Sequence, residues 1–85
     1  MAKFKTEIFG HQIDIFASRW SGRETVSCKG EVKSDFRNIK TVVGLHHFEA
    51  EEEGEKAVYE VNVIGGILGF GYAIRRNGII VKHQP

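Results

Sequence analysis

Proline is almost missing from this chain, because the only one is Pro85. Residues 1–84 therefore lack the residue that removes a hydrogen bond from a β-ladder. Cysteine is just as scarce: Cys28 stands alone, which excludes an intrachain disulfide and fits a reducing compartment. The first residues, MAKFKTE, also lack the apolar run of an export signal. We therefore expect a cytoplasmic protein.

The sequence also lacks a long apolar run and a strong net charge. Its longest uncharged stretch, residues 61–74, contains Asn62 and four glycines, and a membrane-spanning helix needs about 18 apolar residues. The formal net charge is +1, whereas a nucleic-acid-binding domain usually carries a large basic excess. We therefore expect no transmembrane segment, and the charge balance counts against nucleic-acid binding.

What the sequence does have is short stretches of alternating apolar and polar residues. In residues 3–9, Phe4 and Ile8 share one face while charged side chains occupy the other, which is typical of a half-buried strand. Asn77-Gly78 between two apolar segments is a strong hairpin signal. About eight short strands at roughly ten-residue spacing predict one all-β domain over residues 1–85. We expect an antiparallel β-sandwich, with a small, partly open β-barrel as the alternative.

Three places interrupt this alternation. Gly44 divides an apolar, β-branched segment and predicts a bulge or a change of strand. Residues 35–38 have the composition of a loop. Residues 49–56 hold five glutamates around Gly54, and we interpret them as a solvated hairpin loop because their spacing does not match a calcium-binding loop.

No group of residues has the spacing of an active site, a metal site or a cofactor site. His46 and His47 are adjacent, and neighbours in a strand point to opposite faces, so we expect one half-buried and one exposed histidine. Cys28 shares a face with Val26 and is predicted to lie in the core. The sequence therefore predicts no enzyme, no metal and no cofactor.

Two segments are candidates for contact with a partner, and the first is the glycine-rich stretch 65–71. Its apolar side chains are Ile67, Leu68 and Phe70. We favour a flexible or bulged connection here. The functional alternative is an apolar loop tip, with Arg75 and Arg76 close behind it, that contacts a protein or a membrane surface.

The second candidate is Trp20, which stands between Arg19 and Arg23. This composition is typical of an interaction hot spot. We nevertheless favour a structural role in which Trp20 folds back over the core, since the only tryptophan of a small domain is usually buried.

These segments lead to two functional hypotheses. The first is a non-enzymatic module that binds a protein partner, or itself, through the glycine-rich loop with help from Trp20. The second is binding of nucleic acid or another acidic ligand by an arginine-rich face. The arginines of that face would be Arg19, Arg23, Arg37, Arg75 and Arg76.

The stretch from Trp20 to Ser34, WSGRETVSCKGEVKS, contains a Ser-Gly-Arg turn, a strand and a glycine-centred hairpin. It resembles a hairpin of small, uncharacterised bacterial β-domains, and this resemblance extends over residues 13–81. More distantly, it is similar to the β-sandwich repeats of the Fas apoptotic inhibitory molecule family, which share the turn and the strand–Gly–strand after it. The resemblance implies an antiparallel sandwich and supplies no catalytic residues.

Overall fold

The computed structural model of the chain describes residues 2–18, 20–38, 43–66 and 69–84. In these residues the secondary structure is entirely β, as the alternating pattern predicts. The strands are β1 (Ala2–Ile8), β2 (His11–Ala17), β3 (Arg23–Cys28), β4 (Glu31–Arg37), β5 (Val43–Glu52), β6 (Glu55–Gly66), β7 (Gly69–Arg76) and β8 (Ile79–Gln84).

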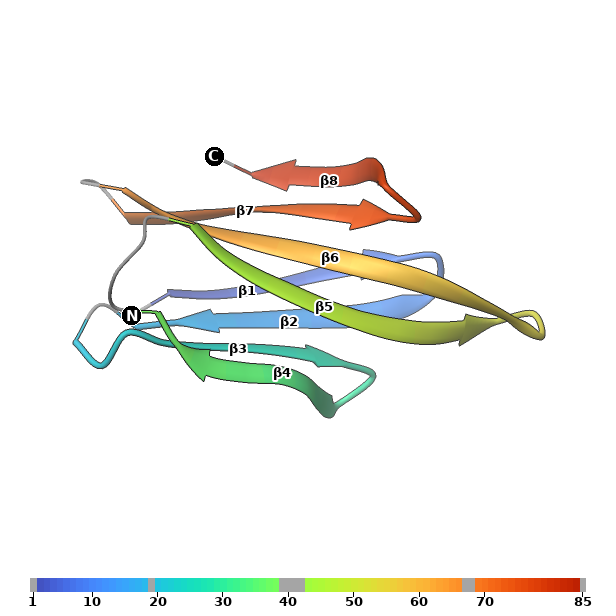
Figure 1. The fold of residues 1–85 in the computed structure, drawn as a ribbon, viewed down its shortest axis with the longest axis horizontal. Coiled ribbons are helices and arrows are strands. Elements are labelled where there is room, and N and C mark those ends of the chain that lie inside the picture. Colours follow the sequence, from blue (N-terminus) through green and yellow to red (C-terminus); the bar gives the residue numbers. More distant parts are fainter. Residues whose placement is uncertain (1, 19, 39–42, 67–68, 85) are drawn as a thin grey trace.

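The strands form two antiparallel sheets, each a simple meander. The first sheet has the order β1-β2-β3-β4 and the second has the order β5-β6-β7-β8 (Figure 1). The two sheets pack face to face and do not close into a barrel. The predicted sandwich is therefore confirmed, and the barrel alternative is not the fold that is seen.

The hydrophobic core lies between the two sheets, where the alternation of each strand directs its inner side chains. The first sheet contributes Ile8, Ile13, Ile15, Ala17, Val26 and Cys28. The second contributes Phe48, Ala50, Ala57, Tyr59, Val61, Val63, Tyr72 and Ile74. Cys28 is 3% exposed, which confirms its predicted place in the core.

Four tight hairpin turns gather at one end of the molecule, which we call the hairpin end (Figure 1, right). They are Phe9-Gly10, Lys29-Gly30, Glu53-Gly54 and Asn77-Gly78. Both residues of each turn have positive φ angles, as type I′ turns require because their twist matches that of the flanking strands. β2 begins at the hairpin end and runs to the other end of its sheet, so the β2–β3 turn lies at the opposite end of the molecule (Figure 1).

The structure corrects three local expectations. Residues 35–37 belong to β4 rather than to a loop, and the acidic segment 49–56 is mostly strand around a two-residue turn. Gly44 causes neither a bulge nor a change of strand; β5 is in register with β6 from Val43 to Glu52. The register shifts instead between Val26 and Ser27, opposite β4, and between Ile74 and Arg75, opposite β8.

Candidate functional site

The turn between β2 and β3 presents Trp20 to solvent. Ser18 N donates to Arg23 O (3.0 Å), and Gly22 N donates back to Ser18 O (2.9 Å). Asn38 N donates to Gly22 O (2.7 Å), which ties the turn to the end of β4. On this support the Trp20 side chain is 97% exposed, so the expectation that it covers the core is wrong.

The neighbouring arginines are placed by the pairing of β3 with β4. Arg23 stands opposite Arg37, and its guanidinium holds Asp35 with two hydrogen bonds, of 2.7 and 3.0 Å. This contact lowers the pKa of the Asp35 carboxyl below its ordinary value. Arg19 lies outside the described residues. The charge of Arg23 is therefore partly compensated, and Arg37 extends the basic character of this turn.

Within the glycine-rich segment 65–71, the end of β6 at Gly66 and the start of β7 at Gly69 lie at the same end of the sandwich as the Trp20 turn (Figure 1, left). Ile67 and Leu68 lie outside the described residues. The chain is described up to Gly66 and again from Gly69. Phe70 is half-buried and packs against the core. The described parts of the two candidate segments thus lie at one end of the fold.

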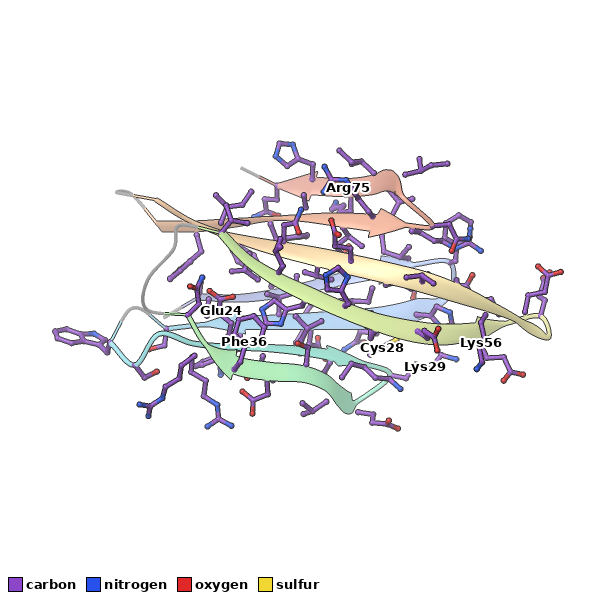
Figure 2. All side chains as sticks on the ribbon, in the orientation of Figure 1. Glu24, Cys28, Lys29, Phe36, Lys56 and Arg75 are labelled. Atoms are coloured by element: carbon purple, nitrogen blue, oxygen red, sulfur yellow. The ribbon has the colours of Figure 1, made fainter. Side chains whose placement is uncertain are left out.

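Arg75 and Arg76 do not lie close behind that loop, because β7 carries them to the hairpin end. Arg75 Nη1 lies 3.2 Å from Glu60 Oε2 on the outer face of the second sheet (Figure 2). Arg76 is bound to Glu52. The described arginines of the predicted basic face are therefore divided, with Arg23 and Arg37 at the Trp20 end and Arg75 and Arg76 toward the hairpin end.

The hairpin end contains an open cleft of about 820 Å³. Its walls come from all four type I′ turns and the strands beside them, including Lys29 and Lys56, which Figure 2 shows toward this end. Its lining residues are Phe9, Gly10, His11, Lys29, Glu51, Glu52, Glu53, Glu55, Lys56, Ala57, Arg76 and Asn77. The sequence gives no sign of this cleft, because its walls come from four separate parts of the chain.

Glu52 organises the floor of the cleft. Its carboxylate accepts hydrogen bonds from Arg76 Nε (2.9 Å), from Arg76 Nη2 and from the Tyr59 hydroxyl (2.5 Å). These contacts, led by that with Arg76, lower the pKa of Glu52 from 4.5 to about 2. His11 Nε2 lies 2.8 Å from the same carboxylate. Glu52 therefore connects the second sheet to the first.

Phe9 forms an exposed aromatic wall of the cleft. Its side chain is 64% exposed, and the Arg76 guanidinium carbon lies 4.2 Å from the ring centroid. The φ angle of Phe9 is 48°, a left-handed conformation that is costly for a bulky side chain. Lys29, Glu53 and Asn77 have the same conformation at the first position of the other three type I′ turns, so it belongs to the turn type.

A second polar cluster, which sequence reasoning missed, connects the sheets on the β4–β5 side. Ser34 Oγ lies 2.7 Å from His46 Nδ1, and His46 Nε2 lies 2.9 Å from Glu24 Oε1. The three residues come from β4, β5 and β3, which meet only in the folded chain. Their separation of 12 and 22 positions leaves no local pattern to find.

This cluster has the connectivity of a serine–histidine–acid triad, but its surroundings favour a structural role. His46 is 0% exposed, and the Phe36 ring stacks on it with the centroids 4.2 Å apart. Figure 2 shows Glu24 and Phe36 side by side, and Asn38 Nδ2 occupies the second oxygen of Glu24 (3.2 Å). A catalytic histidine must reach the leaving group, and this one is enclosed. We interpret the cluster as a polar clamp between the sheets.

His47 points outward and is exposed, so the two histidines lie on opposite faces as predicted, with His46 buried completely. Within the described residues, no three histidine, cysteine, aspartate or glutamate side chains form a metal-ligand group.

The fold and these clusters define a small antiparallel β-sandwich of two four-stranded meanders, fastened by polar contacts between its sheets. No family model, no curated protein and no solved structure matches this chain. In the part of the chain that the structure describes, no helix is long and apolar enough to cross a membrane.

Proposed function

We propose that this protein is a non-enzymatic interaction module and that Trp20 is its principal contact residue. The observation that carries the proposal is the 97% exposure of Trp20 on a turn held by backbone hydrogen bonds. A large aromatic side chain buries about 150–250 Å², which at about 25 cal/mol per Å² corresponds to about 4–6 kcal/mol. Folding leaves this surface exposed, so the figure is an upper limit on what its burial by a partner contributes before the costs of association are subtracted.

The order of the turn strengthens the case. Binding costs about 0.5–1.5 kcal/mol for each side chain that has to be immobilised, and an ordered loop lowers the total. The three backbone hydrogen bonds of Ser18, Gly22 and Asn38 fix the turn before any partner arrives. Tryptophan and arginine, both present here, are the residues most enriched in binding hot spots.

A protein partner fits these observations better than a nucleic acid. A single-strand-binding surface combines aromatic side chains with a continuous basic groove. Here the arginines are divided between the two ends, and Arg23, Arg75 and Arg76 are each paired with a carboxylate. The proposal includes a contribution from Ile67 and Leu68 of the glycine-rich segment, no cofactor, and a cytoplasmic location.

The test compares two variants, each of which removes one exposed apolar side chain. Trp20→Ser removes the proposed contact, and Val32→Ser removes a side chain that is 56% exposed on β4. Surface changes of this kind usually alter stability by less than about 0.5 kcal/mol, which thermal unfolding checks. Immobilised wild type and both variants are incubated with nuclease-treated lysate, and bound proteins are quantified by mass spectrometry.

We expect a partner recovered with wild type and Val32→Ser but lost with Trp20→Ser. A second readout is fluorescence: Trp20 is the only tryptophan, so its emission shifts to the blue when the purified partner covers it. Equal recovery by all three proteins, or binding without an emission shift, would overturn the proposal.

A further inference from the structure

We infer that a second copy of this chain is a partner of Trp20: the Trp20 turn of one copy docks into the hairpin-end cleft of the next. This inference rests on the proposed role of Trp20 and names the surface that receives it. The turn and the cleft lie at opposite ends of the sandwich, because β2 begins at His11 in the cleft and ends just before the turn (Figure 1). The contact is therefore head to tail, between two different surfaces.

The cleft offers an aromatic side chain a suitable surface. Phe9 is 64% exposed, and Arg76 lies against its ring. An incoming indole can stack on the phenyl ring and on the guanidinium, and both contacts are favourable.

The charges of the two ends are complementary. The lining of the cleft carries four glutamates against Lys29, Lys56 and Arg76, a formal charge of −1. At the Trp20 end, the described residues 20–23 and 35–38 carry Arg23, Arg37 and Asp35, a formal charge of +1. Opposite potentials of this kind favour association and orient it. Two ends of like charge would repel each other, so head-to-tail contact is preferred over tail-to-tail contact.

The size of the ends sets the strength of the contact. The molecule measures 40 × 21 × 19 Å, so each end presents a cross-section of roughly 400 Å². Two such surfaces bury about 800 Å², below the roughly 1,200 Å² of stable complexes, and this predicts weak, reversible association. A head-to-tail contact that does not close into a ring continues as a chain.

Sedimentation equilibrium over a wide range of protein concentration tests the inference, with two variants that each remove one side of the contact. Trp20→Ser removes the inserted side chain. Glu51→Lys combined with Glu53→Lys reverses the charge at the cleft while leaving Glu52 and its partners in place. We expect the mean mass of wild type to rise with concentration, and to rise less as salt is added, while each variant remains a monomer.

Mixing the two variants is the decisive measurement. The Trp20→Ser chain keeps its cleft, and the charge-reversed chain keeps its tryptophan, so one intact contact is restored. We expect heterodimers and nothing larger. Three results would overturn the inference. They are a mixture that stays monomeric, a wild type that is monomeric at every concentration, and a Trp20→Ser chain that associates as strongly as wild type. Wild type can recover a lysate protein that Trp20→Ser does not, and yet be monomeric itself. In that case the proposed function stands and only this inference fails.

Discussion

Gly44 leaves the space that Glu24 occupies, and substitution by alanine tests the clamp between the sheets. A Cβ atom at position 44 would lie 1.8 Å from Glu24 Oε1 and 2.7 Å from Cδ. The backbone of Gly44 is not in the left-handed region, so alanine is tolerated there except for this clash. The flexible carboxylate can rotate away, but it then leaves His46 Nε2 and Asn38 Nδ2.

The expected cost follows from the lost hydrogen bonds rather than from steric pressure. A buried polar group left without its partner costs about 1–3 kcal/mol, and His46 is fully enclosed. We therefore expect Gly44→Ala to lower the free energy of unfolding by about 1–3 kcal/mol, each kcal/mol shifting the melting temperature by about 4–8 °C in a domain of this size. Gly66→Ala is the comparison variant, because among the described residues its Cβ would meet Gly69 O at 3.3 Å, a contact that a shift of a few tenths of an ångström relieves.

A double-mutant cycle identifies the cause. In a Glu24→Ala background the clash is gone, so Gly44→Ala should be neutral or stabilise by about 0.5–1 kcal/mol, the usual gain from replacing glycine in a strand. Urea unfolding at neutral pH supplies the four free energies. A coupling of at least about 1 kcal/mol supports the clamp. Additive effects of the two substitutions would refute the reasoning.

Three further predictions concern other parts of the fold. The pKa of Glu52 is depressed from 4.5 to about 2, so its contribution to stability is complete above the unfolded pKa and is lost as the pH falls toward 2. The urea midpoint of Glu52→Gln should therefore fall less steeply with acid than that of wild type. Equal slopes would contradict the assignment. Cys28 is buried and its thiol pKa is raised by burial, so we expect a disulfide reagent to modify it only in denaturant; rapid reaction of the native protein would show that the core opens. Lys29 has a φ angle of 54° in an exposed turn. Lys29→Asn should therefore stabilise the protein by about 0.5–1 kcal/mol, measured by thermal unfolding. A loss of stability would mean that the lysine makes a stabilising contact in the turn.

Much of the fold was predictable because strand formation leaves a local record. Alternation indicated which side of β1, β2, β3 and β6 is buried, and it placed Cys28 in the core and the two histidines on opposite faces. Asn77-Gly78 marked a hairpin that the structure contains. The errors came where a residue's role depends on a distant neighbour: Gly44 was interpreted as a local irregularity, although it makes room for a side chain 20 positions earlier in the chain.

The sequence by itself determined most of the strands and turns and the inner faces of β1, β2, β3 and β6, because these follow from backbone preferences and from the period of two. Only the tertiary structure decided which side chains meet across the sandwich. Glu24 and His46 are joined by the packing of one sheet on the other, and the cleft at the hairpin end exists because four turns converge there. The exposure of Trp20 was decided in the same way: its turn is held by hydrogen bonds to its own backbone and to the end of β4, which direct the side chain into solvent.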